Sequence, residues 1–376
     1  MKVYFDNAAT TSIDQEVVKT MTDIMQKDFG NPSSVHSHGR HIKSVIEQSR
    51  RTVAKILNAS PTEIFFTSGG TESDNMALIC SVEDLGIRNI ISSPIEHPAV
   101  LHTLDYLENS GRSEVHYLNI DKDGNVNLTQ LDELLSQFPK TLVSLMHANN
   151  EIGNILDLQK VSEICRKHNA LFHSDTVQSI GHHEFNLKEL DIDFITGSAH
   201  KFHGPKGVGF IYINKKNKIN PFIHGGGQER NMRGGTENVY GIAGLAKALE
   251  ISAENREKNN KHIRTLKSHM IKELQKNIKD LKFNGISHKE ETLYTVLNVS
   301  FPCINLADFL LLKMDMKGIS ASGGSACSSG SIVGSHVLSV VSAEKERPSV
   351  RFSFSKHNTL EEVDYVVSVL KEICSE

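Results

Sequence analysis

The stretch that decides the fold is Ser198-Ala199-His200-Lys201-Phe202-His203-Gly204-Pro205-Lys206-Gly207, which follows the apolar run 192–195. A second apolar run, 170–172, leads to Asp175, 26 positions before Lys201. Two strands of a parallel sheet that end at the same edge can place both side chains over one crevice. Lysine forms Schiff bases with carbonyl cofactors, and pyridoxal phosphate needs such a lysine and an acid at its ring nitrogen. Taken alone, Lys201 is more typical of a solvated surface turn, so the neighbouring motifs must decide.

Composition limits the possible functions. The chain has 376 residues, 38% of them hydrophobic, which suffices for a large core and predicts two domains. A net charge of −4 without a basic run argues against nucleic acid as a partner. Because no apolar run reaches membrane-span length and no signal-peptide pattern is present, we expect a cytoplasmic protein without membrane association. Five scattered cysteines without a Cys-x-x-Cys pair indicate neither a disulfide framework nor a structural zinc site.

Helical and strand patterns alternate from about residue 40 to 215, which predicts an α/β fold with a mostly parallel sheet covered on both faces. Strands are expected at 63–67, 88–92, 114–118, 141–146, 170–174, 193–196 and 208–213, and helices at 42–57, 71–85, 98–109, 128–137 and 157–168. A helical region from about 236 to 279 is expected to connect two domains. Beyond it, strands at 296–301 and 349–355, a helix at 305–316 and a helix from 360 predict a smaller α+β domain.

Three polar motifs follow expected strands. Residues 67–73, Thr-Ser-Gly-Gly-Thr-Glu-Ser, open a helix whose N-terminus suits a phosphate, although an ordinary capped loop is equally compatible. His97 can stack on a π-system, but a loop histidine without a role is commoner. The carboxamides of 147–153, His-Ala-Asn-Asn-Glu-Ile-Gly, can hold a phenolic oxygen or a carboxylate, although an Asn-rich turn is favoured when this motif is taken alone.

Two glycine-rich stretches come later in the chain. Residues 224–236 contain Arg230, Arg233 and Thr236, and we interpret them as an anion-binding or subunit-contact loop rather than a mobile linker. Residues 322–331 contain Cys327, which is flanked by Gly and Ser, as expected of an exposed, reactive thiol rather than an incidental cysteine. The histidine clusters at 36–41 and 182–183 lack ligand spacing, so we predict no metal site.

Together, ten segments resemble, in order, the cysteine desulfurases of the nitrogen-fixation and iron–sulfur-cluster type, in the class V aminotransferase group of fold-type I pyridoxal-phosphate enzymes. The segments are 6–11, 30–34, 67–75, 96–97, 147–153, 173–178, 198–207, 225–236, 325–327 and 350–353. The resemblance implies a large cofactor-binding domain, 15–255, with a seven-stranded-type sheet between helices. It also implies a small α+β domain, 1–14 and 256–376, that carries the cysteine loop 320–335.

The resemblance also implies a role for individual residues. Lys201, Cys327 and His97 form the implied catalytic set: Lys201 holds pyridoxal 5'-phosphate covalently and His97 stacks on its ring. The other implied cofactor contacts are Asp175 at the ring nitrogen, Gln178 at the phenolic oxygen, and Gly70, Thr71, Ser198, His200 and the Thr236 of a partner subunit at the phosphate.

The same resemblance implies a substrate, a product and partners. Asn150 and Arg351 would bind the carboxylate of L-cysteine. Cys327 would attack the sulfur, leaving L-alanine and a persulfide that passes to a sulfur-acceptor protein, either a cluster scaffold or a thiolation relay. The implied assembly is a homodimer.

Several positions depart from the family pattern. Thr176-Val177, Gly70 and 332–334 differ from the common residues, His203 stands where Tyr is usual, and Lys356-His357-Asn358 replaces Gly-Arg. None removes a catalytic group, but they leave the acceptor open.

The alternatives are a selenocysteine lyase, another class V enzyme such as a transaminase, and a catalytically inactive partner subunit. A transaminase needs no thiol in such a loop, and selenocysteine lyases have an Arg/His-containing sequence around theirs. The intact Lys201, Asp175, His97 and Cys327 argue against an inactive subunit.

Overall fold

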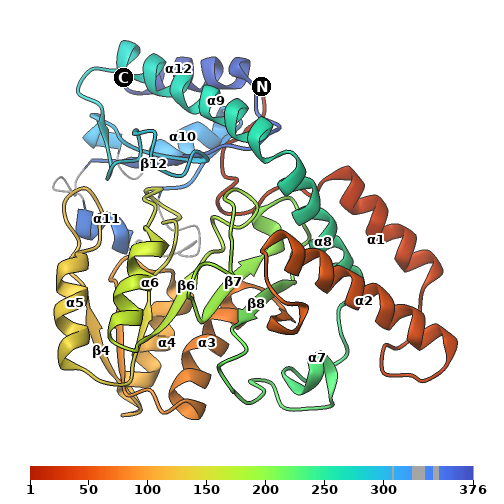
Figure 1. The fold of residues 1–376 in the computed structure, drawn as a ribbon. Helices are drawn as coiled ribbons and strands as arrows, with labels where there is room; N and C mark the ends of the chain where they lie inside the picture. Colours follow the sequence, from red (N-terminus) through yellow and green to blue (C-terminus); the bar gives the residue numbers. More distant parts are fainter. Residues whose placement is uncertain (307–308, 324–334, 342–346, 376) are drawn as a thin grey trace.

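The computed structural model describes residues 1–306, 309–323, 335–341 and 347–375, so Cys327 and most of the predicted cysteine loop lie outside the described residues. Its main feature is a seven-stranded sheet with the strand order β2-β8-β7-β6-β5-β3-β4 (Figure 1). The strands are β2 (Ile64–Thr67), β3 (Asn89–Ser92), β4 (Glu114–Tyr117), β5 (Thr141–Ser144), β6 (Leu171–Asp175), β7 (Phe194–Ser198) and β8 (Gly209–Ile213). Only β8 pairs antiparallel with its neighbours in this sheet, so the predicted α/β fold with a mostly parallel sheet is confirmed.

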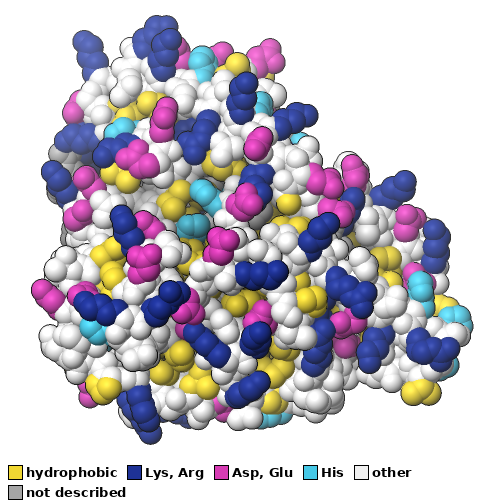
Figure 2. Space-filling view, in the orientation of Figure 1, with side chains coloured by type: hydrophobic (Ala, Val, Ile, Leu, Met, Phe, Trp, Pro, Cys, Tyr) yellow, Lys and Arg dark blue, Asp and Glu magenta, His cyan; other side chains and the backbone are white. Residues whose placement is uncertain are grey.

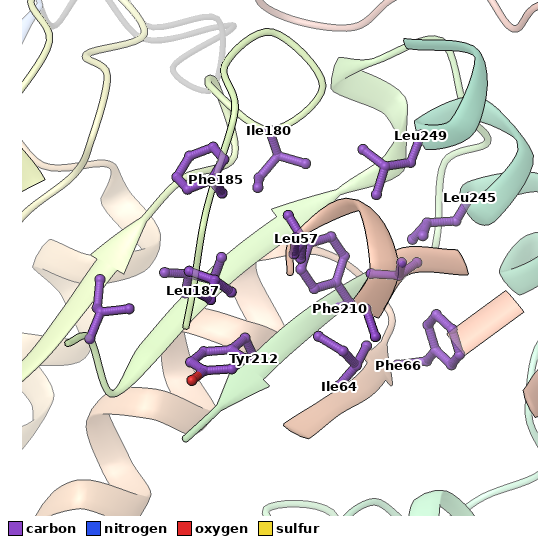
Figure 3. Close-up of a cluster of buried hydrophobic side chains, with 14 of the residues drawn as sticks. Leu57, Ile64, Phe66, Ile180, Phe185, Leu187, Phe210, Tyr212, Leu245 and Leu249 are labelled. Carbon is purple, nitrogen blue, oxygen red and sulfur yellow. The ribbon is translucent and has the colours of Figure 1, made fainter. Parts of the chain in front are cut away.

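Helices cover both faces of the sheet, because successive side chains of a strand point to opposite faces and the central strands are buried at consecutive positions. One face packs against α3 (Gly70–Asp84) and α4 (Pro98–Asn109). The other packs against α1 (Gln15–Lys27), α2 (Ser37–Ile56), α5 (Leu128–Gln137), α6 (Leu158–Lys167) and α8 (Val239–Glu254). Figure 3 shows part of this second core, where Phe66 and Phe210 of the sheet meet Leu57, which follows α2, and Leu245 of α8.

A smaller body holds both chain termini (Figure 1). It contains the antiparallel order β12-β10-β9, formed by β9 (Lys282–Phe283), β10 (Val296–Ser300) and β12 (Ser349–Ser353), and a parallel pair of β1 (Val3–Tyr4) with β11 (Ile319–Ser320). The long helices α9 (Arg256–Asn277) and α12 (Leu360–Ile373) pack together over this sheet. Short elements complete the described chain: η1 (Pro61–Glu63), η2 (Ala199–Lys201), α7 (Gln228–Asn231), η3 (Ile304–Leu306), α10 (Leu310–Met316) and α11 (His336–Val341).

The N-terminal segment joins the two bodies. The Ser353 amide of β12 donates to the Phe5 carbonyl at 2.7 Å, which fixes the segment to the smaller sheet. A few residues later the Thr11 amide donates to the His200 carbonyl at 2.9 Å, and the Asp14 amide donates to the His203 carbonyl at 3.0 Å. Residues 5–14 therefore run from the smaller sheet to the loop after β7.

The helical region expected over 236–279 is present and consists of two helices. It divides at Asn255 into α8 and α9, because the Asn255 side chain donates to the Ile251 carbonyl at 2.9 Å and competes with the backbone ladder. Helix α1 was not expected from the sequence, and Val17 is its one fully buried residue.

The described surface is mixed in charge. Figure 2 shows Lys and Arg side chains interspersed with Asp and Glu over the face in view. Among the described helices, none combines the length and apolar character needed to cross a membrane.

A buried ion pair fixes the glycine-rich stretch against the sheet. Arg50 of α2 donates to both carboxylate oxygens of Glu229, at 2.7 and 2.9 Å, and Glu229 also accepts from the Phe66 amide at 2.8 Å. Glu229 has φ 43°, a left-handed conformation that costs energy in a non-glycine residue. The pair therefore holds a strained turn in place.

We predict that Arg50→Met destabilises the protein by about 3 to 5 kcal/mol, because it leaves the Glu229 carboxylate buried without its charge partner. Urea unfolding of the variant measures this loss. Arg166→Met is the matched control, because the Arg166–Asp191 pair is partly exposed and should contribute about 1 kcal/mol or less. Equal losses in the two variants would contradict the assignment.

Candidate active site

A cavity of about 560 Å³ opens at the carboxyl ends of β6 and β7. Ten of the twelve residues predicted from the sequence line it: Gly70, Thr71, His97, Asn150, Asp175, Gln178, Ser198, His200, Lys201 and Arg351. Thr236 lies instead in an adjacent cavity that shares Ser68 and Gly207 with the first. Cys327 lies outside the described residues.

The parallel register of β6 and β7 positions the acid and the amine. Asp175 pairs with Thr196, and Lys201 follows in the 3-10 turn η2 after β7 ends. The Asp175 Oδ1 accepts from the Val177 amide at 2.9 Å, which orients the carboxylate. The Lys201 Nζ donates to the carbonyls of Ala8 and Ala9, at 2.5 and 3.0 Å. The amine is thus held at the cavity wall by the N-terminal segment.

His97 presents a neutral ring to the cavity. It is the N-cap of α4, and its Nδ1 accepts from the Ala99 amide at 3.1 Å, so Nδ1 carries no proton. Burial lowers the pKa of His97; the Lys201 charge lowers it further, while Asp175 opposes the shift. A neutral imidazole is suited to stacking on an aromatic ring.

The opposite end of the cavity suits an anion. Helix α3 begins at Gly70, and the first backbone N–H groups of a helix lack intrahelical partners and lie at the positive end of its dipole. A Cβ at Gly70 would come within 2.7 Å of Val177 Cγ2, so glycine keeps the backbone close to this wall. His200 Nδ1 lies 3.2 Å from Thr10 Oγ1, and burial lowers the pKa of His200 to about 4.

Arg351 lines the cavity from the smaller body. Its side chain is 1% exposed, and its Nη2 donates to Asp6 Oδ1 at 2.9 Å while Nη1 donates to the Asn150 carbonyl at 3.0 Å. Its buried Nε has no partner among the described residues. Buried donors are nearly always satisfied, so this N–H is suited to a carboxylate ligand.

Both described flanks of the Cys327 segment contact residues beside the cavity. Ser322 donates from Oγ to Asp6 Oδ1 at 2.7 Å, the same oxygen that accepts from Arg351. On the other side, the His336 Nε2–H donates to the Glu96 carbonyl at 2.9 Å. The described chain on either side of residues 324–334 is therefore fixed close to Arg351 and His97.

Two buried acids near Asp175 lie within the matched segments 67–75 and 96–97, but sequence reasoning assigned neither of them a role in the site. Asp74 accepts from the Thr196 hydroxyl at 2.9 Å, and burial, reinforced by Asp175, raises the pKa of Asp74 well above its usual value. Glu96 Oε1 accepts from Ser93 Oγ at 2.8 Å and from the Met146 amide at 3.0 Å, and burial raises the pKa of Glu96 to about 8. Burial therefore favours the protonated form of both acids, and Glu96, with a pKa of about 8, is mostly protonated at neutral pH.

The arginines of the glycine-rich stretch differ from expectation. Arg233 pairs with Glu72 at 2.9 Å and Arg230 with Glu47 at 2.8 Å, both within the same chain. Anion binding by either arginine would require breaking an internal ion pair. The sequence pattern showed the cations but not the distant carboxylates that neutralise them.

We predict that Glu96→Gln gains stability relative to the wild type as the pH rises from about 5 to about 8. The pKa of Glu96 rises from 4.5 to about 8 on folding, so in this window the folded protein holds a proton that the unfolded chain has lost. The contribution of Glu96 to the free energy of unfolding therefore decreases as the pH rises, and a glutamine, which does not titrate, does not show this decrease. Thermal midpoints of both proteins across this range test it; a difference that does not change with pH would contradict it.

Comparisons with known proteins agree on one family. The model of the class V aminotransferase family matches residues 3–366. A relative from Dictyoglomus turgidum named cysteine desulfurase IscS is 42% identical over 99% of this chain and 94% of its own length. A solved structure described as a NifS-like protein superposes with a TM-score of 0.91 at 41% identity, covering 100% of both chains. Another, described as SspA in complex with cysteine, gives a TM-score of 0.82 at 29% identity, covering 95% of this chain and 100% of its own.

Both the sequence and the fold of this chain are similar to those of known proteins along nearly its whole length. The class V family model spans nearly the whole chain, and the similarity to the named relatives extends over almost their full length. This chain belongs to the class V aminotransferase family and, within it, to the cysteine desulfurases of the nitrogen-fixation and iron–sulfur-cluster type.

Proposed function

We propose that this protein is a cysteine desulfurase that uses pyridoxal 5'-phosphate to convert L-cysteine to L-alanine and keeps the sulfur as a persulfide on Cys327. The observation that carries the proposal is the single cavity in which Lys201, Asp175, His97 and Arg351 meet. Relatives named cysteine desulfurase and a neighbour solved with cysteine support the same substrate. Sulfur then passes to an acceptor protein for iron–sulfur cluster assembly or thiolation.

The cavity residues fit the cofactor as a set. Lys201 provides the amine for a Schiff base, Asp175 an acid for a ring nitrogen, and the neutral His97 a surface for the ring. The N-terminus of α3, with Gly70 and Thr71, and the nearby Ser198 and His200 suit the phosphate. Gln178 Nε2, which donates to the Ala8 carbonyl at 3.0 Å, is the proposed donor to the phenolic oxygen.

Bound there, pyridoxal phosphate acts as an electron sink for the substrate's α-carbon. Asp175 holds the proton on the ring nitrogen, which strengthens that sink. Lys201 moves the proton at the α-carbon, and Arg351 with Asn150 fixes the substrate carboxylate. A fixed carboxylate orients the sulfur for attack.

Cys327 takes up the sulfur. Its thiolate attacks the substrate sulfur, so a sulfur–sulfur bond forms while the substrate's carbon–sulfur bond breaks. The electron pair of that bond stays on carbon, which is protonated to give the methyl group of L-alanine. In net terms one sulfur atom passes from L-cysteine to the Cys327 thiol, with no external oxidant or reductant.

The rival functions explain the chain less well. A transaminase does not use a thiol, and a selenocysteine lyase is disfavoured by the Gly/Ser setting of Cys327. An inactive partner subunit would have no need for a buried Arg351, whose Nε has no partner among the described residues, in the wall of the cavity that holds Lys201.

We predict that Cys327→Ser still binds the cofactor and still shifts its absorption band when L-cysteine is added, but yields neither sulfide nor persulfide. A serine hydroxyl is a poor nucleophile and cannot hold transferable sulfur. Lys201→Ala is the comparison variant, and should lose both the covalent cofactor link and turnover. Alanine release, sulfide release and persulfide mapping by mass spectrometry measure the outcome.

The four described cysteines serve as further controls. Cys80, Cys165, Cys303 and Cys374 should each be replaceable with little loss of turnover. Desulfuration at the wild-type rate by Cys327→Ser, or a persulfide on one of these four, would reject Cys327 as the nucleophile.

We further propose a division into a large domain, 15–255, and a small domain, 1–14 with 256–376, assembled as a homodimer. The separate sheets and cores of the two bodies support the division. Thr236 lies outside the cavity that holds Lys201, which supports a role at the phosphate of the partner's site.

Mixed dimers test this arrangement. We predict that Lys201→Ala and Thr236→Asp proteins, each inactive alone, regain about half of the wild-type activity per dimer when combined, because one of the two sites then has both wild-type residues. The two variants are co-expressed with different tags, the mixed dimer is purified by both tags, and its desulfurase activity is measured. Absence of recovery would show that Thr236 acts in its own subunit, and a fully active monomer in sedimentation would reject the dimer.

A further inference from the structure

Three potential metal ligands from distant parts of the chain meet beside the active site. Asp14 immediately precedes α1, His203 is two residues after Lys201, and His357 follows β12. One ligand atom from each lies within 4.8 Å of the others. The two imidazole rings meet edge to face, with centroids 5.2 Å apart. The three side chains therefore converge on one point between the two bodies.

His203 is held with one ring nitrogen available as a ligand. Its amide donates to Thr11 Oγ1 at 2.8 Å, and its Nδ1 lies 2.9 Å from the Ser12 carbonyl. A carbonyl can only accept, so Nδ1 carries the proton and Nε2 of the neutral ring keeps its lone pair. A backbone carbonyl on the second nitrogen is the usual support for a metal-bound histidine.

The Asp14 carboxylate is directed away from its own helix. An aspartate at an N-cap ordinarily accepts from the first-turn amides, but the Asp14 side chain makes no such hydrogen bond. Its Oδ2 lies 2.5 Å from Lys356 Nζ, and its Oδ1 lies 3.6 Å from His357 Nε2. Lys356 thus provides the cation that neutralises this carboxylate, and Oδ1 faces the histidines.

We propose that Asp14, His203 and His357 form a binding site for a divalent transition-metal ion of the Zn²⁺ or Co²⁺ class. Two imidazoles, one carboxylate and a water complete a tetrahedral set. The His357 side chain is 55% exposed, which gives an ion access from solvent. No metal site was predicted from the sequence, because Asp14, His203 and His357 are separated by up to 343 positions (357−14).

A bound ion would connect three segments that belong to different parts of the enzyme. His203 is in the loop of Lys201, His357 is six residues after Arg351, and Asp14 ends the segment that supports both. The ion would therefore restrain the cofactor-side lysine loop relative to the strand that carries Arg351. This proposal stands independently of the proposed desulfurase activity.

The site can be tested without any activity measurement. The holoenzyme is titrated with Co²⁺ while the visible ligand-field bands of the bound ion are recorded, and calorimetry measures the binding of Zn²⁺. We expect one ion per subunit without a thiolate charge-transfer band. His357→Ala, His357→Gln and His203→Tyr should each weaken binding by at least about tenfold, since each removes one of three ligands. Lys356→Met should strengthen binding several-fold, because it removes the cation that competes for Asp14.

His269→Ala is the matched control, since His269 lies beside Asp364 at 2.6 Å, on the surface and away from the cluster. This variant should bind the ion as the wild type does, and far-UV circular dichroism should show that all variants are folded. The proposal is overturned if folded His357→Ala and His203→Tyr bind as tightly as the wild type, if thiolate bands accompany binding, or if no saturable binding occurs.

Discussion

The parallel pairing of β6 with β7 is the constraint on which the site depends. Because the register sets Asp175 opposite Thr196, the two strands end together, and the turn after β7 returns Lys201 toward the acid. A register shift of two residues would separate the amine from the carboxylate by about 7 Å, since a strand rises about 3.3 Å per residue. The buried apolar residues on both faces of these strands secure the register, so the large core positions the chemistry.

The second constraint is the N-terminal segment. Its carbonyls at Ala8 and Ala9 accept from Lys201, its Asp6 pairs with Arg351, and its amides bond the chain at His200 and His203. One short segment therefore contacts both the amine and the guanidinium, which come from different bodies. This arrangement explains why residues distant in sequence can line one cavity, and it places the proposed metal cluster at the end of the same segment.

Much of this arrangement could be predicted from sequence, and the rest could not for physical reasons. Strand ends and glycine-rich turns are local signals, so the lining residues from Gly70 to Arg351 were found. The neutralisation of Arg230 and Arg233 depends on Glu47 and Glu72, which only the folded chain brings near. Likewise the buried acids Asp74 and Glu96, and the meeting of His203 with His357, result from tertiary packing that leaves no spacing pattern in the sequence.

Burial also simplifies the charges around the cavity. Burial raises the pKa of Asp74 and of Glu96, which favours their uncharged forms, while it lowers the pKa of His97 and of His200 and keeps both rings neutral. A wall of ionised carboxylates behind Asp175 would repel a phosphate and a substrate carboxylate by several kcal/mol at the distances within a small cavity. Lys201 and Arg351 line the same cavity, and Asp6 already offsets part of the Arg351 charge. Desolvation of the surrounding groups, rather than added positive charge, thus makes this cavity suitable for anions.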